Sequence, residues 1–405
     1  MFIKRKFVIL PKIREMKRIC FIVDSIFSIG GVQRVTAVIA KELAMDYDVT
    51  IVTFDKPEAK DTSLYDLQDA NVSYRFFSYP PKKRWKMYIC KAYSALYLKW
   101  QPRAKWASDL YAISSFPSEL RNALAAELRE GHYDTIIGVH APLAARLATI
   151  KDQLPNTKLI GWIHNSFEAL FNDTSLYIGA ERKRHYIYQF RKLDEVIVLC
   201  KHDAESYNNY DRAFMPTAIY NPLTLQPGAI SEGDSKRFLA VGRFSRQHKG
   251  FDLLIEAFNL FAQKNKEWSL DLVGEGVEEE LYRSLIRKYH LEKRIIIHPF
   301  TNQIQDYYSK AQIYVLSSRW EGFGLVLVEA MAHGLPIISS DLPTSLEILG
   351  DYGLYFKNGD IQDLASKLEE ATTLNWDEMS QQALEIAQRF NIEHIIPQWK
   401  QLLEA

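Results

Sequence analysis

The sequence lacks a surplus of charge, because its 405 residues hold 50 basic and 50 acidic side chains. Proteins attracted to nucleic acid by their overall field carry a basic excess. The balance therefore gives no support to nucleic acid as a partner, and any basic surface must be local.

Cysteine is scarce as well. Cys20, Cys90 and Cys200 are odd in number and far apart, so none of them forms the closely spaced pair of a metal site. Cys20 and Cys200 stand in apolar runs and are expected to be buried as small hydrophobic side chains. This usage favours a reducing compartment.

Long apolar runs are missing too. No stretch reaches the ~18 residues that suggest a membrane-spanning helix. The run Phe7–Leu10 is too short for the core of a signal peptide and stops at Pro11. The first convincing strand starts near Arg18, so residues 1–15 are interpreted as a dispensable extension.

What is present is a repeated alternation of short apolar runs with amphipathic helical patterns. Strands that are apolar on both faces are typical of parallel sheets covered by helices, and alternating strand–helix order predicts doubly wound α/β domains. Because single cores stop growing near ~250–300 residues, we expect two domains. The predicted strands of the first half are Ile19–Asp24, Val49–Phe54, Thr135–Val139, Lys158–Ile163 and Glu195–Leu199.

A polar stretch rich in proline and glycine, from Asn221 to Asp234, marks the predicted linker. The alternation then restarts, which predicts an N-terminal domain over 16–220 and a C-terminal domain over 221–385. The predicted strands of the second half are Phe238–Val241, Leu270–Val273, Ile295–His298, Ile313–Leu316 and Pro336–Ser339.

Ligands of open parallel sheets bind beyond the carboxyl ends of the strands, so the residues that follow each strand carry most information. Gly30 and Gly31 follow the first strand and open a helix, where free N–H groups attract phosphate; a plain turn would look the same. Arg243 and Lys249 stand at the two ends of a loop after a strand of the second half, which suits a diphosphate.

Two further loops carry polar candidates. The segment Glu321-Gly-Phe323-Gly324-Leu325 leads into an apolar helix that contains Glu329, and a carboxylate in such a helix needs a partner. Its oxygens accept hydrogen bonds well from sugar and ribose hydroxyls. His164 follows an apolar strand and can donate a hydrogen bond or transfer a proton, although its position taken alone favours a capping or structural role. His140 is a similar, weaker candidate.

Taken together, these segments resemble a retaining glycosyltransferase family with the two-domain GT-B fold, often called family 4. The resemblance rests on the early Gly-Gly turn, the Gly-Arg…Lys-Gly loop and the Glu-x7-Glu element, in that order over most of residues 16–400. It implies two facing Rossmann-like domains with the donor cleft between them. It also implies that a last segment, 386–405, with Trp399 near its end, crosses back onto the N-terminal domain.

The resemblance also implies roles for individual residues. Arg243 and Lys249 would hold the donor diphosphate, together with N–H groups near Gly30 and Gly31. Glu329 would bind the ribose, and Glu321 would contact the donor sugar. The remaining implied contacts are the backbone of Phe323, Gly324 and Leu325 with the donor, and His164 near the reacting centre.

No metal and no cofactor is expected, and the donor is a UDP-sugar in preference to a GDP-sugar. The base is expected near Gly274–Gly276 and Pro299–Asn302. Asp46-Tyr47-Asp48, a possible metal motif, is interpreted as a turn. Where family members often carry Glu two positions after the Gly-Gly pair, this chain has Gln33, so no carboxylate acts there.

Residues 80–106 concentrate eight basic and no acidic side chains with six tyrosines and tryptophans. Basic and aromatic residues on one helix suit an anionic membrane interface, although a solvated helix has the same composition. We therefore expect a cytoplasmic protein attached peripherally to the inner face of the cytoplasmic membrane. Its expected acceptor is a lipid-linked saccharide in the synthesis of a cell-surface polysaccharide, such as capsule or lipopolysaccharide.

Three alternatives stay open beside this hexosyl or N-acetylhexosaminyl transfer. An epimerase or a phosphorylase could use the same fold, and a non-catalytic subunit could bind nucleotide sugar without reacting. The intact residues Arg243, Lys249, Glu321 and Glu329 favour the enzyme. A Rossmann dehydrogenase is disfavoured, because the Gly-x-Gly-x-x-Gly fingerprint is missing after the first strand.

Overall fold

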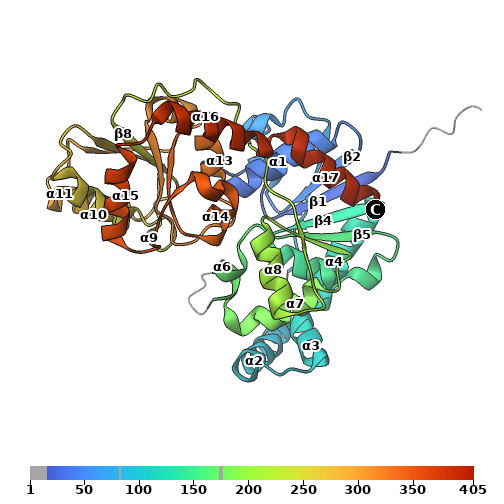
Figure 1. Ribbon diagram of the computed structural model, residues 1–405. Coiled ribbons are helices and arrows are strands. Elements are labelled where there is room, and N and C mark those ends of the chain that lie inside the picture. The colour runs from blue at the N-terminus through green and yellow to red at the C-terminus, as the bar shows by residue number, and fades with distance from the viewer. Residues whose placement is uncertain (1–15, 82–83, 173–176) are drawn as a thin grey trace, which may run out of the picture.

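The computed structural model describes residues 16–81, 84–172 and 177–405, and it contains two parallel sheets. The first has the order β3-β2-β1-β4-β5-β6-β7 and the second the order β10-β9-β8-β11-β12-β13. The two domains lie side by side (Figure 1). The prediction of a GT-B type α/β fold with two Rossmann-like domains is confirmed. The predicted extension 1–15 lies outside the described residues.

The N-terminal sheet is covered by helices on both faces, as its doubly apolar strands require. In the parallel register, Phe21 stands opposite both Ile51 and Ile137, and all five residues of β4 are buried. The strands are β1 Arg18–Val23, β2 Asp48–Thr53, β3 Val72–Phe76, β4 Thr135–Val139, β5 Lys158–Trp162, β6 Glu195–Val198 and β7 Thr217–Ala218. The helices are α1 Gly31–Leu43, α2 Arg84–Trp100, α3 Lys105–Ser115, α4 Ser118–Glu130, α5 Ala141–Ala148, α6 Phe167–Phe171, α7 Lys183–Phe190 and α8 Lys201–Tyr210.

The C-terminal sheet repeats this plan with six strands. They are β8 Arg237–Val241, β9 Ser269–Val273, β10 Ile295–His298, β11 Ile313–Leu316, β12 Ile337–Ser340 and β13 Leu354–Phe356. The helices are α9 Arg246–Lys249, α10 Phe251–Ala262, α11 Glu279–Lys288, α12 Gln305–Lys310, α13 Leu325–Ala332, α14 Pro343–Leu349, α15 Ile361–Ala371, α16 Trp376–Ala387 and α17 Ile392–Glu404. Helix α13 ends as predicted, since Gly334 has the left-handed φ of 72° that favours glycine after a helix.

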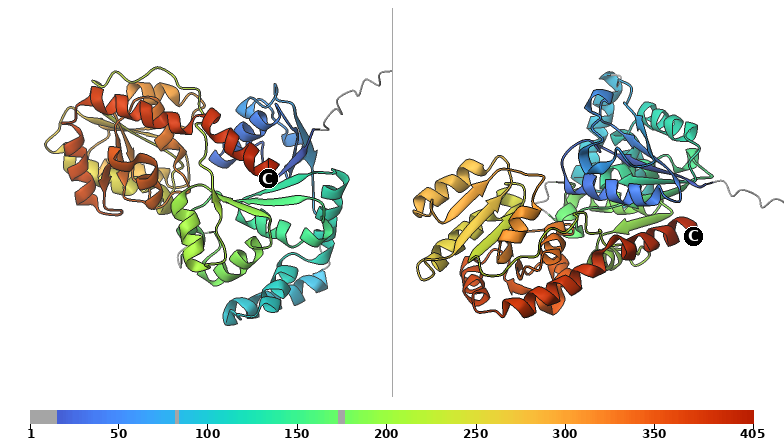
Figure 2. Two further views of the ribbon diagram at one scale, coloured as in Figure 1. Left: turned by 45° about the vertical axis from the view of Figure 1, so that its right-hand side comes forward. Right: turned by 90° about the horizontal axis from the view of Figure 1, so that it is seen from above.

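The last helix leaves the C-terminal domain and lies along the N-terminal one, where both views of Figure 2 place it beside α1. Lys17 Nζ donates to the carbonyl of Leu403 at 3.0 Å, and Lys158 Nζ donates to that of Leu402 at 2.7 Å. Two lysines of the N-terminal domain thus occupy carbonyls at the end of α17 that no further helical turn would satisfy.

Two predictions about polar and sulfur side chains can be compared directly with the structure. Cys20 and Cys200 are buried free thiols, as expected. The carboxylates of Asp46 and Asp48 do not converge on a shared ligand, because Asp46 pairs with Lys400 at 2.5 Å and Asp48 with Arg18 at 3.1 Å. Within the described ranges, no cluster of three or more histidine, cysteine or acidic side chains is placed to hold a metal ion.

Candidate active site

The loop between β1 and α1 is held in place by side chains from outside it. Tyr65 accepts the N–H of Gly30 at 2.9 Å and donates to the carbonyl of Ser28 at 2.9 Å. Asp55 accepts the N–H of Ile26 at 2.8 Å. These hydrogen bonds tie the loop to the segments that carry Asp55 and Tyr65, and thereby orient the N-terminus of α1.

That terminus lies against the C-terminal domain. A Cβ added at Gly31 would come within 3.3 Å of the side chain of Leu325, the first residue of α13. Gly324, just before it, has the left-handed φ of 81°. The N-termini of α1 and α13 therefore meet across the domain boundary, and helix N-termini attract anions.

Of the two candidate cations in the loop after β8, Lys249 is buried and Arg243 is exposed. Lys249 is 9% exposed, and its Nζ donates to Glu321 Oε1 at 2.5 Å. The carbonyl of Arg243 accepts the N–H of Ser245 at 2.8 Å, but its side chain is exposed and its guanidinium has no hydrogen bond or ion pair with any residue that the structure describes. Its charge still acts on neighbours, since it opposes protonation of His248. One cation is thus engaged and the other is available to a ligand.

Glu321 is the centre of a buried polar cluster. Its Oε1 also accepts the hydroxyl of Ser318 at 2.6 Å, and its Oε2 lies 3.6 Å from His248 Nε2. Burial alone would raise the pKa of Glu321, but the charge of Lys249 and the contacts with His248 hold it well below its ordinary value. His248 in turn stacks on Trp320, with ring centroids 3.7 Å apart. Glu321 is therefore a fixed negative charge at neutral pH.

Glu329 has the partners that its apolar helix demands. Arg34 of α1 forms an ion pair with its Oε1 from the other domain, and the Tyr308 hydroxyl donates to its Oε2 at 2.9 Å. His333 Nδ1 lies 2.7 Å from the Glu329 carbonyl, while its Nε2 accepts the N–H of Gly228 at 3.2 Å. The expectation that this carboxylate needs a partner is confirmed.

His164 closes the site from the N-terminal domain. Its ring lies 4.3 Å from that of Trp162, which in turn lies 4.7 Å from Trp399 of α17. Burial, and to a smaller degree His140, holds the pKa of His164 well below its ordinary value, so the ring is neutral. Its buried Nε2 has no hydrogen-bond partner among the described residues. A neutral ring can donate or accept one hydrogen bond here, which suits orientation better than proton transfer.

The backbones of the two domains touch at this point. A Cβ added at Gly322 would lie 2.2 Å from the carbonyl oxygen of His164. Only glycine allows such an approach without movement. The segment 321–325 and the loop after β5 are thereby brought together, as the predicted donor cleft requires.

The side chain of Phe323 is buried in the core. Its ring is 3% exposed and lies 6.1 Å from that of Tyr220 and 5.8 Å from that of Phe390. The ring therefore belongs to the core. Any contact of Phe323 with a donor must come from its backbone.

The glycines near the expected base pocket have a packing role. A Cβ at Gly274 would lie 2.0 Å from the Gly242 carbonyl, and one at Gly276 would lie 2.5 Å from that of Phe244. Phe244 also donates its N–H to the Glu275 carbonyl at 2.7 Å. The loops after β8 and β9 thus support each other, and a base site there stays a prediction.

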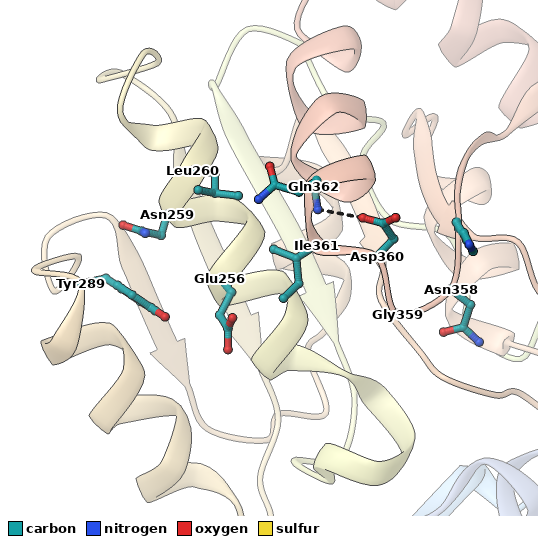
Figure 3. A pocket seen from close by; sticks show the side chains of 10 residues that line it. Glu256, Asn259, Leu260, Tyr289, Asn358, Gly359, Asp360, Ile361 and Gln362 are labelled. Carbon is teal, nitrogen blue, oxygen red and sulfur yellow. Dashed lines mark hydrogen bonds between the residues drawn. The ribbon is translucent and has the colours of Figure 1, made fainter.

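A surface hollow of about 580 Å³ lies elsewhere in the C-terminal domain, between α10 and α15 (Figure 3). Asp360 at its rim already caps α15 by accepting the N–H of Gln362 at 3.0 Å. None of the predicted site residues lines this hollow, so it has no part in the site described above. Its lining consists of Glu256, Asn259, Leu260, Tyr289, Lys357, Asn358, Gly359, Asp360, Ile361 and Gln362.

Several residues of the site were not singled out from the sequence. Tyr65, Tyr308 and Arg34 stand outside the loops that follow the strands in question, so no local pattern marks them. His248 lies inside the loop from Arg243 to Lys249 and Trp320 directly precedes Glu321, but their stacking depends on the fold. The one usable signal was the demand of a buried carboxylate for a partner.

Comparison with known proteins shows similarity to glycosyltransferases. Residues 226–390 match the family described as "Glycosyl transferases group 1". An uncharacterized glycosyltransferase of Haemophilus influenzae is 27% identical over 406 residues, which cover 96% of this chain and 100% of that protein. The amylovoran biosynthesis glycosyltransferase AmsD of Erwinia amylovora is 26% identical, over 84% of this chain and 85% of its own.

The fold itself is similar to that of Anabaena HepE, solved in complex with UDP and glucose. The TM-score is 0.72 and the identity 19%, and the match covers 96% of this chain and 99% of HepE. The class defined by fold and site is therefore the two-domain GT-B architecture. Within that class, the comparisons support a glycosyltransferase similar to the group 1 family.

Proposed function

We propose that the protein is a retaining, metal-independent glycosyltransferase that moves a hexose or N-acetylhexosamine from a nucleotide sugar to a saccharide acceptor. The observation that carries the proposal is the meeting of two sets of residues at one domain boundary. Lys249, Glu321 and Glu329 come from the C-terminal domain, and Gly31 and His164 come from the N-terminal one. UDP is favoured over GDP as the donor nucleotide, and the complex of HepE with UDP supports this choice.

In the proposed mechanism, positive charge neutralises the leaving diphosphate. Arg243 and Lys249 and the N-termini of α1 and α13 supply that charge, since preorganised dipoles and cations stabilise charge that develops during reaction. Glu321, ionised and fixed, faces the sugar and accepts hydrogen bonds from its hydroxyls. Glu329 holds the ribose, and neutral His164 orients the sugar beside the bond that breaks. The acceptor oxygen then bonds to the anomeric carbon on the face that the diphosphate leaves, while the bond from that carbon to the diphosphate oxygen breaks. The proton of the acceptor hydroxyl passes to the departing diphosphate, and the configuration is retained.

Arg243 offers the cleanest test, because it is exposed and its replacement leaves no buried group unpaired. We expect one UDP- or GDP-sugar to raise the melting temperature of the full chain and to be hydrolysed slowly. Arg243→Ala should lower the affinity for that nucleotide sugar about tenfold, as loss of a charged hydrogen bond does. The matched control is Lys266→Ala. Lys266 is an exposed cation just before β9, at the amino ends of the strands, whereas Arg243 follows the carboxyl end of β8.

The outcomes separate the candidate functions. Stabilisation without hydrolysis or transfer would favour the non-catalytic subunit. A response that is the same in Arg243→Ala and Lys266→Ala would move the donor site away from β8. No response to any nucleotide sugar would contradict the proposal.

We further propose that the hairpin α2–α3 attaches the enzyme to an anionic membrane that carries a lipid-linked acceptor. The hairpin projects from the N-terminal domain on the side away from the C-terminal one (Figure 1). Among the side chains of the hairpin that the structure describes, seven large apolar ones are exposed, and they recur at helical spacing. They are Tyr88, Ile89, Leu96, Trp100, Trp106, Leu110 and Ile113. Tyr97 and Tyr111 instead stack inside the hairpin, with centroids 4.4 Å apart.

Exposed cations border this apolar face, namely Lys91, Lys99, Arg103 and Lys105. Each basic residue near an anionic surface contributes about 1 kcal/mol. Of the helices that the structure describes, none combines the length and apolar character needed to cross a bilayer. Lys82 and Lys83, part of the same basic segment, lie outside the described residues.

Vesicles of phosphatidylcholine with phosphatidylserine test the attachment in a flotation assay. Changing the four bordering cations to Gln should abolish binding, whereas four exposed lysines of the C-terminal domain changed to Gln should leave it intact. Those controls are Lys264, Lys266, Lys288 and Lys293. Equal binding of both variants would contradict attachment through the hairpin.

A further inference from the structure

The ion pair between Arg34 and Glu329 occupies the place where the proposed function puts the ribose of the donor. The side chain of Glu329 is 3% exposed and that of Arg34 23%. With Tyr308 on its second oxygen at 2.9 Å, both oxygens of Glu329 are engaged without a donor. Because the Glu329 side chain is almost fully covered, a ribose can reach the carboxylate only if one of the two donors moves aside.

Arg34 also lies close to the proposed diphosphate site. Its backbone N–H donates to the Gly30 carbonyl at 3.0 Å, in the first turn of α1. The charge of its guanidinium acts on Tyr65, whose hydroxyl accepts the Gly30 N–H at 2.9 Å. One arginine thus stands between the loop assigned to the phosphates and the carboxylate assigned to the ribose.

The guanidinium has a donor to spare. Arg34 Nε is buried and has no hydrogen-bond partner among the described residues. Buried polar groups without a partner are costly, and a guanidinium fork fits phosphate oxygens well. Separating Arg34 from Glu329 costs free energy. This cost is smallest when a ligand supplies new partners for both groups, and largest when it supplies none.

We propose that Arg34 exchanges partners when the donor binds, and thereby selects nucleoside diphosphates. This inference rests on the proposed function. The ribose hydroxyls replace the guanidinium on Glu329, and the guanidinium turns to the diphosphate. A nucleoside without phosphates can satisfy Glu329 but leaves the guanidinium unpaired. Arg34 therefore strengthens binding of a diphosphate and weakens binding of the bare nucleoside.

Calorimetric titration of the full chain with UDP, UMP and uridine tests the exchange. If GDP stabilises the chain instead, GDP, GMP and guanosine take their place. Arg34→Gln should weaken UDP about tenfold and leave uridine equally or more tightly bound, with UMP between them, so that the preference for UDP over uridine falls at least tenfold. Arg34→Lys, which keeps the charge but not the fork, should retain part of that preference.

The control is Lys400→Ala, which removes a different ion pair, the one between Lys400 of α17 and Asp46 of the N-terminal domain. It should change none of the three affinities. An equal loss for all three ligands in Arg34→Gln would show a merely structural role, and unchanged affinities would show no role; either result overturns the inference. Failure of the proposed function would look different. In that case the wild-type chain would show no binding of a nucleoside diphosphate that weakens in Arg243→Ala.

Discussion

At the scale of single residues, the site depends on charges that are buried in pairs. Removing one member of such a pair leaves the other unpaired, which costs several kcal/mol. Glu321 and Lys249 are 7% and 9% exposed, so neither regains water when its partner is lost. The pair therefore contributes to stability and to the proposed chemistry at once.

Glu321→Gln should lower the free energy of unfolding by about 3 kcal/mol at neutral pH, because it leaves the Lys249 ammonium buried opposite a neutral amide. The pKa of Glu321 is lowered in the folded state, so the unfolded chain takes up the proton first as pH falls. The difference between wild type and variant should stay constant above the ordinary carboxyl pKa and shrink below it. Urea unfolding at pH 8, 6, 5 and 4 measures this difference.

The control is Glu370→Gln, which breaks an exposed pair with Lys367 at 2.7 Å. Exposed pairs contribute ~0–1 kcal/mol. A Glu321→Gln variant that is as stable as this control would show that the Lys249 charge is satisfied by other means.

The sequence indicated which residues of the site carry charge, but not how they pair. Glu329 demanded a partner because its helix is apolar, yet Arg34 lies 295 positions away in the chain. Its choice depends on how two domains dock, which no local pattern records. The same holds for Trp399, whose contact with Trp162 supports His164 from the far end of the chain.

At the scale of elements, every interior strand was predicted, whereas of the four edge strands only β10 matches a predicted range. β4, buried throughout, matches its predicted range, whereas β3 at the sheet edge is mostly half-exposed and was not expected. The two-residue β7 and the three-residue β13 were missed as well, because so few residues establish no period.

The hairpin α2–α3 is an element whose attachment should depend on pH. Ser108 of α3 lies 2.8 Å from His185 Nδ1 of α7, and both are buried. Burial lowers the pKa of His185 to about 4, Lys192 acts in the same direction, and Asp109 opposes it. Because the unfolded chain protonates near the ordinary pKa of 6.5, stability is lost as pH falls from 6.5 towards 4.

His185→Asn should therefore remove part of this pH dependence. Between pH 7.5 and pH 5, the stability of the wild type relative to the variant should fall by about 2 kcal/mol, since each unit corresponds to ~1.4 kcal/mol. Urea unfolding at both values measures it. His290→Asn, at an exposed histidine after α11, should show no such change. Parallel curves for wild type and His185→Asn would mean that His185 takes up its proton in the folded state.

At the scale of the whole molecule, two kinds of contact join the domains: side-chain hydrogen bonds, which can adjust by rotation of the side chain, and a backbone contact, which cannot. Glu347 of α14 accepts the N–H groups of Lys201 and His202, at 2.7 and 2.9 Å, at the start of α8. It also accepts the Tyr220 hydroxyl at 2.7 Å. Such side-chain links can adjust, whereas the contact of Gly322 with the His164 carbonyl joins backbone to backbone.

Gly322→Ala should consequently separate the domains without unfolding them. The new methyl group would lie 2.2 Å from a carbonyl oxygen that the chain after β5 holds in place, so the domains must move apart. We expect a larger radius of gyration by small-angle scattering, an unchanged circular dichroism spectrum and at least a tenfold loss of transfer, since misplacement by about 1 Å can cost ~100-fold. The matched variant for the distance between the domains is Gly31→Ala, whose methyl group would meet a flexible leucine side chain at 3.3 Å. Because Gly31 belongs to the proposed donor site, only its scattering curve is compared. If Gly322→Ala keeps the scattering curve and the activity of the wild type, the segment 320–322 relaxes locally; an expansion confined to Gly322→Ala, with loss of transfer, would mean that the site forms only when the two domains approach to this distance.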